Sequence, residues 1–119
     1  MLAMRTVRYL TTIALSVSFV SPILAETVDV KYRGAVDLKP FECSEISRSS
    51  FITRVCYDHV NQYMLIRLNS TYYHYCELPT DVLTDFMAAP SMGSFYNQRI
   101  KGNGSDGPFD CRRHKVPSY

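Results

Sequence analysis

Side chains at the centre of the chain, in residues 51–77, alternate with a period of two, as is typical of β-strands. Between residues 51 and 57 every second side chain faces the same way, at Phe51, Thr53, Val55 and Tyr57. Residues 63–68 and 71–77 alternate in the same manner. Turn-forming residues at 58–62 and the pair Asn69-Ser70 separate the three segments. This pattern predicts a three-stranded antiparallel meander.

The spacing of apolar positions becomes helical after the meander. Pro79 ends the third strand, and Thr80 is a suitable N-cap for a helix that Pro90 ends. Ser91 can cap a second helix, which Gly102 would follow. The apolar positions of the two helices are Val82, Leu83, Phe86, Met87, Met92, Phe95, Tyr96 and Ile100. The predicted fold class is α+β, a small antiparallel three-stranded meander with two short helices packed on one face.

The segments on either side of residues 49–102 have weaker patterns. Residues 26–48 are predicted to be an extended N-terminal arm, in which the alternation of Val28, Val30 and Tyr32 allows a short strand. Residues 103–119 are predicted to be an irregular C-terminal tail, held only at Cys111.

The first 25 residues have the pattern of an export signal. Arg5 and Arg8 precede an apolar run over residues 9–20, and Pro22 and Ala25 form a suitable cleavage region. The run is shorter than the roughly 20 apolar residues that span a bilayer, so no stable membrane anchor is expected. We expect a protein that is exported to the periplasm or secreted after cleavage near Ala25.

Removal of this signal changes the charge of the protein. The 119-residue chain has 13 Lys and Arg and 11 Asp and Glu, and residues 1–25 contain two of the basic residues and none of the acidic ones. Residues 26–119 therefore have a formal net charge of zero. A neutral domain has little long-range attraction for phosphate backbones, which makes nucleic acid an improbable partner after export.

Four cysteines, Cys43, Cys56, Cys76 and Cys111, lie beyond the signal. An even number in a small exported domain is typical of disulfides, and the absence of a Cys-x-x-Cys pair argues against a metal site. In a simple meander Cys56 and Cys76 would lie two strand spacings apart, roughly 9.5 Å, which disfavours a bond between them. The strand cysteines would instead bond to Cys43 and Cys111, in a connectivity that the sequence leaves open.

Several short motifs between residues 49 and 102 resemble, in order and spacing, the pattern of the KTSC domain. The matching positions are Ser49 or Ser50 with Ile52, Tyr57-Asp58, Leu65, Tyr73-His74-Tyr75, Leu78-Pro79, Ala89, Ser91-Met92-Gly93, Phe95-Tyr96-Asn97 and Ile100-Lys101. The family is named for its occurrence at the C-terminus of some lysyl-tRNA synthetases and also occurs in small bacterial proteins. The resemblance implies a family for which RNA binding has been suggested and no function is established.

Two groups of side chains are candidates for binding. Tyr73 and Tyr75 share one face of the third strand and could stack bases or sugars, or could instead pack beneath the helices. The second group surrounds the start of the second helix and could hold an anion, or could instead form a tight helix corner in which Gly93 allows close approach. Its members are Ser91, Gly93, Tyr96, Asn97, Arg99 and Lys101.

No arrangement typical of catalysis is evident. His59, His74 and His114 are scattered, the cysteines are expected to be oxidised, and there is no Gly-x-Ser-x-Gly motif. We therefore expect an exported, non-catalytic binding module without a cofactor or metal, whose partner is a protein or another envelope component. An RNA- or single-strand-binding module that uses Tyr73 and Tyr75 is the second hypothesis, and a small periplasmic hydrolase is the third.

Overall fold

The computed structural model describes residues 11–17, 25–102 and 107–119 of the chain. Residues 11–17 are exposed and form no helix or strand. The rest of the predicted signal, residues 1–10 and 18–24, lies outside the described residues, so cleavage near Ala25 stays a prediction. In the described part of the chain, no helix is long and apolar enough to span a bilayer.

The predicted meander forms the centre of the sheet. Its strands are β4 (Ile52–Asp58), β5 (Tyr63–Leu68) and β6 (Thr71–Tyr75), and neighbouring strands are antiparallel. Asn69 adopts a positive φ of 54° in the β5–β6 turn, as its place in a tight hairpin requires. The register of β4 shifts between Ile52 and Arg54. Because of this bulge, the buried face of β4 carries Ile52, Val55 and Tyr57. Simple alternation correctly predicted Val55 and Tyr57 on this face, but it predicted Phe51 and Thr53 there in place of Ile52.

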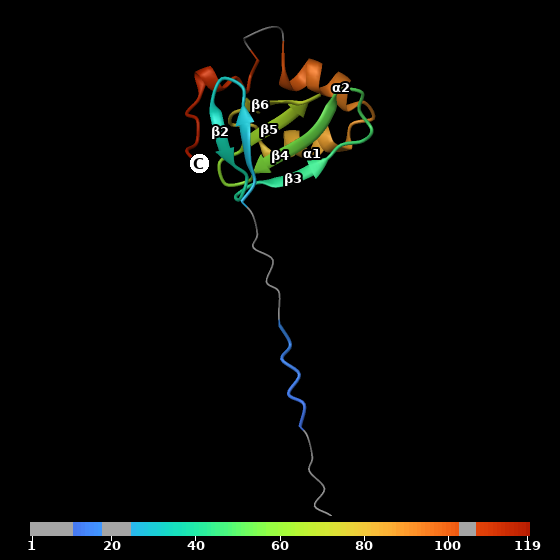
Figure 1. The fold of residues 1–119 in the computed structure, drawn as a ribbon. Coiled ribbons are helices and arrows are strands. Elements are labelled where there is room, and N and C mark those ends of the chain that lie inside the picture. Colours follow the sequence, from blue (N-terminus) through green and yellow to red (C-terminus); the bar gives the residue numbers. More distant parts are fainter. Residues whose placement is uncertain (1–10, 18–24, 103–106) are drawn as a thin grey trace, which may run out of the picture.

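The prediction of only three strands is wrong. The segment expected to be an extended arm forms β1 (Thr27–Val30), β2 (Gly34–Asp37) and β3 (Glu42–Glu45). The sheet is six-stranded and mixed, in the order β2-β1-β6-β5-β4-β3, with β1 parallel to β6 (Figure 1). Each added strand has four residues, which is too short for a clear periodicity. Of the three, only β1 pairs with a strand distant in the chain, β6, whereas β2 pairs with β1 and β3 pairs with β4. Burial of Val30 and Val36 stabilises the β1–β2 hairpin.

The helices cover one face of the sheet, as predicted. They are α1 (Thr80–Ala88), α2 (Met92–Phe95) and the π-helical turn η1 (Tyr96–Ile100). The core on this face contains Ile52, Val55, Tyr57, Met64, Ile66, Leu78, Phe86, Met92, Tyr96 and Ile100. Ser91 caps α2 by accepting a hydrogen bond from the Ser94 N–H, whereas Thr80 is the first residue of α1 and Pro79 occupies the N-cap position.

The opposite face of the sheet is also covered. The β1–β2 hairpin and the C-terminal segment, which includes the short helix η2 (Cys111–Arg113), pack over Cys56, Tyr63, Leu65 and Tyr72. The prediction that the tail is held only at Cys111 is wrong, because Val116 and Tyr119 also contact this second core. In addition, Arg33 Nη2 donates a hydrogen bond to the Pro117 carbonyl oxygen.

Both pairs of cysteines form disulfides. Cys43–Cys56 joins neighbouring positions of β3 and β4, with 4.0 Å between the Cα atoms, and Cys76–Cys111 joins the end of β6 to η2. The Cys56–Cys76 bond that the meander geometry disfavoured is absent. Each disulfide therefore attaches one flanking segment to the central meander.

Asp58, at the end of β4, connects the sheet to the C-terminus. Its carboxylate accepts hydrogen bonds from the Val60 N–H at 3.0 Å, from Asn61 Nδ2 at 2.7 Å and from the Tyr119 hydroxyl. Burial alone would raise the pKa of Asp58, but the hydrogen bonds from Tyr119, Asn61 and the backbone outweigh burial and lower this pKa below its usual value. The ionised carboxylate is thus the form that the fold favours.

We expect the Asp58 interaction to be lost in acid. A carboxyl group with a lowered pKa in the folded state stabilises the fold above its ordinary pKa, and this contribution disappears as the pH falls through the folded-state value. The urea midpoint should therefore fall more steeply between pH 7 and pH 2 in the wild type than in Asp58→Asn. Asp85→Asn, an exposed position on α1, is the control and should follow the wild type. Parallel curves for the wild type and Asp58→Asn would contradict this role.

Candidate functional site

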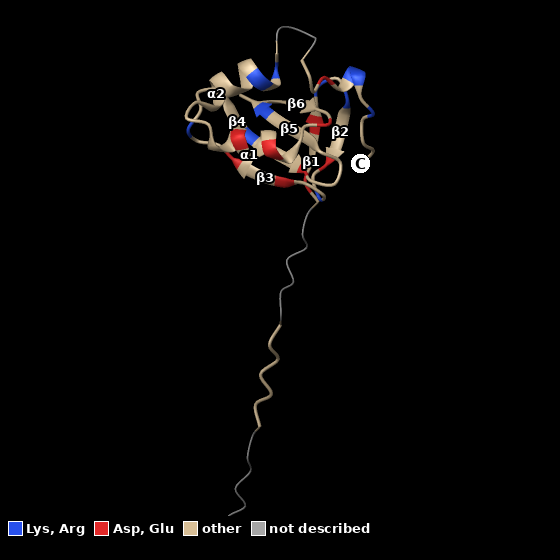
Figure 2. Cartoon of the chain, turned by 180° about the vertical axis from the view of Figure 1, so that it is seen from behind, with Lys and Arg blue, Asp and Glu red and all other residues tan. Residues whose placement is uncertain are grey.

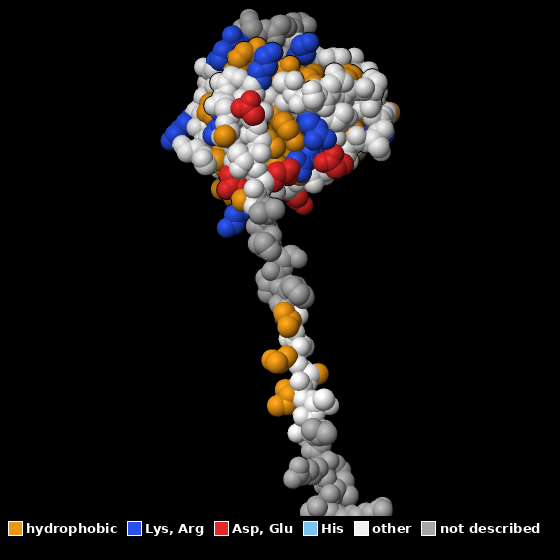
Figure 3. All heavy atoms as spheres, in the orientation of Figure 1, with side chains coloured by type: hydrophobic (Ala, Val, Ile, Leu, Met, Phe, Trp, Pro, Cys, Tyr) orange, Lys and Arg blue, Asp and Glu red, His pale blue; other side chains and the backbone are white. Residues whose placement is uncertain are grey.

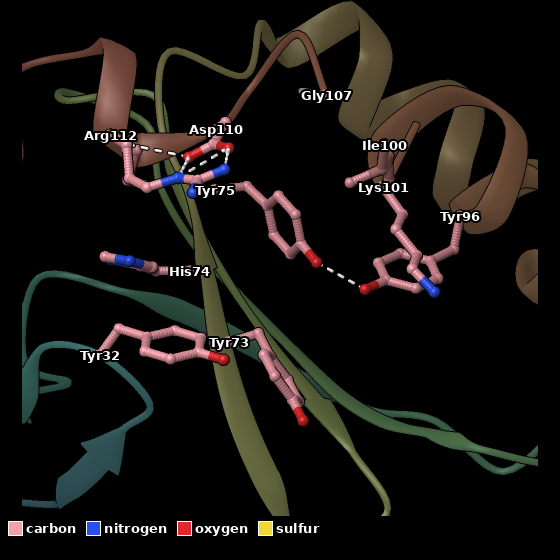
Figure 4. Close-up of a pocket in the computed structure, with 11 residues that line it drawn as sticks. Tyr32, Tyr73, His74, Tyr75, Tyr96, Ile100, Lys101, Gly107, Asp110 and Arg112 are labelled. Atoms are coloured by element: carbon pink, nitrogen blue, oxygen red, sulfur yellow. Dashed lines mark hydrogen bonds and ion pairs between the residues drawn. The ribbon is translucent and has the colours of Figure 1, made fainter. Parts of the chain in front are cut away.

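An open groove of about 650 Å³ lies beyond the end of the β1–β6 pairing. The groove is bordered by β6, by the end of η1, by the turn between β1 and β2, and by the C-terminal segment (Figure 4). Its lining residues are Tyr32, Tyr73, His74, Tyr75, Tyr96, Ile100, Lys101, Gly107, Asp110, Cys111 and Arg112. We call this cavity the tyrosine groove.

The short pairing between β1 and β6 creates the groove. The two strands are in register only at Val30 and Tyr72, and the Lys31 N–H donates to the Tyr72 carbonyl oxygen at 2.9 Å. Beyond this point the chain turns away, so no described strand pairs with the rest of β6 on that side. The side chains of Tyr73 and Tyr75 therefore lie beside an open edge of the sheet.

Tyr75 and Tyr96 form the inner wall of the tyrosine groove. Their hydroxyl groups are hydrogen-bonded to each other, and the rings meet edge to face with 5.9 Å between centroids (Figure 4). Burial raises the pKa of both phenols above the ordinary tyrosine value. Both hydroxyl groups are thus protonated over the physiological range, and this wall is uncharged.

Tyr73 and Tyr32 form the outer part of the groove. Tyr73 is half-buried, and Tyr32 is 84% exposed at the tip of the β1–β2 turn. The ammonium nitrogen of Lys31 lies 5.3 Å from the Tyr32 ring centroid and 5.5 Å from the Tyr73 ring centroid. The sequence singled out Tyr73 but missed Lys31 and Tyr32, which lie in the segment predicted to be an extended arm.

His74 belongs to a hydrogen-bonded chain on the second face of the sheet. Arg33 Nη1 donates to the Tyr63 hydroxyl oxygen at 3.1 Å, and this hydroxyl lies 2.8 Å from His74 Nδ1. Burial, with a smaller contribution from Arg33, lowers the pKa of His74. The imidazole is therefore neutral at physiological pH, and the Tyr63 hydroxyl can donate its proton to Nδ1.

The C-terminal wall of the groove contains an ion pair. The Asp110 carboxylate accepts hydrogen bonds from the Arg112 N–H at 2.9 Å and from Arg112 Nη2 at 2.6 Å. The hydrogen bonds from Arg112 lower the pKa of Asp110 to about 2. Lys101 lies on the opposite, helical side, where Figure 4 shows its ammonium group directed toward Tyr96. Among the described residues, no carboxylate forms an ion pair with Lys31 or Lys101.

A second, smaller groove of about 370 Å³ contains the other predicted binding residues. Ser91, Gly93 and Asn97 line it together with Arg48, Ser49 and Ser50. Its polar groups are largely used within the fold: Arg48 donates to the carbonyl oxygens of Met87 and Ala89, both at 2.7 Å. A Cβ atom at Gly93 would lie 2.7 Å from Phe51 Cε1, so a larger residue here would displace the Phe51 ring. These contacts agree with the alternative of a tight helix corner.

The predicted binding residues are therefore divided between two places. Tyr73, Tyr75, Tyr96 and Lys101 lie together in the tyrosine groove, whereas the serine and glycine residues lie in the smaller groove. Arg99 lines neither cavity, and its guanidinium group lies 5.4 Å from the Phe95 ring centroid.

Comparison with known proteins gives the family of the central region. Residues 48–103 match the sequence model of the KTSC domain, close to the range 49–102 that the motifs indicated. This part of the chain is a KTSC domain. A KTSC domain protein from Yersinia pestis, known from a crystal structure, is 31% identical, and the similarity covers 53% of this chain and 89% of that one with a TM-score of 0.49. No curated protein matches the chain.

The KTSC domain provides only part of the tyrosine groove. It contributes β4, β5, β6 and the helices, and thus Tyr73, Tyr75, Tyr96 and Lys101. The remaining walls come from the β1–β2 turn and from residues 107–112, which flank the domain on both sides. The cavity therefore depends on segments outside the KTSC domain.

Proposed function

We propose that this protein is an exported, non-catalytic binding module that holds its ligand in the tyrosine groove. The observation that carries this proposal is an open cavity lined by four tyrosines and bordered by two lysines without a carboxylate partner in the described structure. Binding sites typically combine aromatic surface with a few convergent polar groups. The tyrosine groove has this composition.

The surroundings of the histidines favour binding over catalysis. His74 Nδ1 is occupied by the Tyr63 hydroxyl, His59 Nε2 lies 2.8 Å from a Glu42 carboxylate oxygen, and His114 Nδ1 contacts the Glu77 carboxylate. All four cysteines are in disulfides. A hydrolase would need a nucleophile, a base and an orienting group that converge, and the described residues show no histidine bonded to a serine or threonine hydroxyl.

Export is supported by the two disulfides and the leader-like first 25 residues. In that compartment the ligand would be a protein or another envelope component. A single-stranded nucleic acid is the second candidate, because accessible tyrosine rings such as that of the half-buried Tyr73 can stack bases. The formal charge of zero over residues 26–119 counts against it, because phosphate contacts supply most of the affinity for nucleic acids.

Tyr73→Ala tests the proposed binding site. The full chain, produced in an exporting host, would be titrated by NMR with short acidic and neutral oligosaccharides, an oligonucleotide and a peptide. We expect at least one of these probes to shift the signals of Tyr73, Tyr75 and Lys101. Tyr73→Ala should then lower the affinity roughly fivefold to 150-fold, since stacking on one aromatic ring is worth about 1–3 kcal/mol.

Asn97→Ala is the matched control, because Asn97 is exposed in the smaller groove. It should leave the affinity and the unfolding temperature unchanged. If the probes shift only signals of the smaller groove, or if none shifts those of the tyrosine groove, the proposed binding site is wrong.

A further inference from the structure

We propose that the tyrosine groove binds an acidic polysaccharide whose sugar rings carry carboxylates. This inference rests on the proposed binding function and names the ligand class. It is drawn from three features of the groove: accessible tyrosine rings, two lysines beside them, and a wall in which His74 and the Asp110–Arg112 ion pair offer hydrogen-bonding groups.

The first feature is the fixed position of Tyr32. Its backbone adopts a φ of +71°, a left-handed conformation that is uncommon for a residue with a side chain. Hydrogen bonds hold the turn on both sides, from Lys31 N–H to the Tyr72 carbonyl and from Arg33 N–H to the Val30 carbonyl. The turn thus presents an exposed aromatic ring beside Tyr73 (Figure 4). Flat aromatic faces of this kind are suitable for stacking against the apolar face of a sugar ring.

The second feature is positive charge at the same end of the molecule. Figure 3 shows lysine and arginine side chains gathered where the β1–β2 turn, η2 and the end of η1 meet in Figure 1. Figure 2 shows acidic residues on β3 and α1, and others beside β6 and next to the basic residues at the top of the molecule. Lys31 and Lys101 border the groove and have no carboxylate partner among the described residues. Both ammonium groups can pair with carboxylates on a bound chain.

The third feature argues for a sugar chain over a nucleic acid. Asp110 places a carboxylate, paired with Arg112, on the C-terminal wall, where it could accept hydrogen bonds from hydroxyl groups, which phosphodiester groups lack. His74 is neutral, and its Nε2 can donate a hydrogen bond when Nδ1 accepts one from Tyr63. A sugar hydroxyl can donate a hydrogen bond to the Asp110 carboxylate and accept one from His74 Nε2. The volume of about 650 Å³ lies in the range of about 300–1,000 Å³ that is usual for small ligands.

The test uses the full exported chain and hexagalacturonate, a chain of six uronic acid rings. Titration should shift the ring signals of Tyr32 and Tyr73, and binding should weaken as salt is added. We expect Lys31→Ala to weaken binding about tenfold, since a hydrogen bond to a charged group is lost. Lys39→Ala removes an exposed lysine outside the groove and should bind as the wild type does.

Two further probes separate the contributions of charge and ring. The methyl ester of hexagalacturonate keeps the rings and loses the charges, whereas hexaglutamate keeps the carboxylates and lacks sugar rings. Both should bind at least about tenfold more weakly than the acid, because each lacks one of the two contacts. Equal binding of hexaglutamate would overturn the assignment to a sugar chain.

The outcomes also distinguish the two proposals. Two more probes are a short RNA, hexauridylate, and a second uronic acid chain, hexamannuronate. If hexauridylate shifts the signals of the tyrosine groove and neither uronic acid chain does, the ligand class is wrong and the binding site is retained. If none of these probes shifts the groove signals, both the ligand class and the proposed site are overturned. Thermal unfolding of Lys31→Ala and Tyr32→Ala should match that of the wild type, because both side chains are exposed.

Discussion

Replacing Phe86 by alanine is expected to lower the free energy of unfolding by about 3–5 kcal/mol. Phe86 is fully buried on α1 and stacks on Phe95 with 5.6 Å between ring centroids. It belongs to the core that joins the helices to β4 and β5. Truncation would remove apolar contacts and leave a cavity between layers that can close only partly. A loss of this size is a large fraction of the about 5–15 kcal/mol typical of a whole domain.

Urea unfolding, followed by circular dichroism, measures the effect of Phe86→Ala. Val60→Ala is the control, because Val60 is 90% exposed in the turn after β4 and should change stability by less than about 0.5 kcal/mol. A loss below about 1 kcal/mol in Phe86→Ala would show that α1 does not pack on the sheet as described.

Removal of the Cys76–Cys111 disulfide is the second large effect that we expect. The bond closes a loop with a sequence separation of 35 residues, so the double variant Cys76→Ala/Cys111→Ala should lose about 4 kcal/mol through the greater freedom of its unfolded chain. The same bond holds the wall that contains Asp110 and Arg112 against β6. We therefore expect this variant to bind hexagalacturonate more weakly even at temperatures at which it remains folded.

The other disulfide provides a matched comparison. Cys43–Cys56 closes a separation of 13 residues and lies outside the tyrosine groove, so Cys43→Ala/Cys56→Ala should lose about 3 kcal/mol and keep its affinity for the ligand. Urea unfolding and titration with hexagalacturonate, carried out on both double variants under the same conditions, measure the loss of stability and the loss of affinity for each disulfide. Equal losses of affinity in the two variants would mean that the Cys76–Cys111 bond has no particular role in the groove.

The centre of the fold could be predicted because its information is local. The alternation in residues 63–68 and the turn at Asn69 define a hairpin within a few residues, and Pro79, Pro90 and Ser91 mark the helix boundaries directly. The bulge in β4 was not predictable, since it arises from how β4 pairs with β5 and leaves no signal in the spacing of apolar residues.

The N-terminal strands were predicted poorly because each has only four residues, and because β1 also depends on β6, a partner distant in sequence. The alternation of Val28 and Val30 allowed a short strand, which β1 confirms, but nothing in these four residues indicated the pairing of Val30 with Tyr72 on β6. The candidate site was found only in part for the same reason. Tyr73 and Tyr75 were recognisable on one strand, but Tyr32 and Asp110 join them only when the two flanking segments fold against β6.

The strand order also affects how copies of this protein meet one another. A sheet made of β4, β5 and β6 alone would expose two unpaired edges, each able to add a strand from a second chain. Here β1 and β3 cover both of these edges. The new outer strands have four residues each, and β3 carries exposed Glu42 and Glu45, whose charges disfavour strand addition. The flanking segments therefore protect the KTSC sheet against edge-to-edge aggregation in addition to completing its groove.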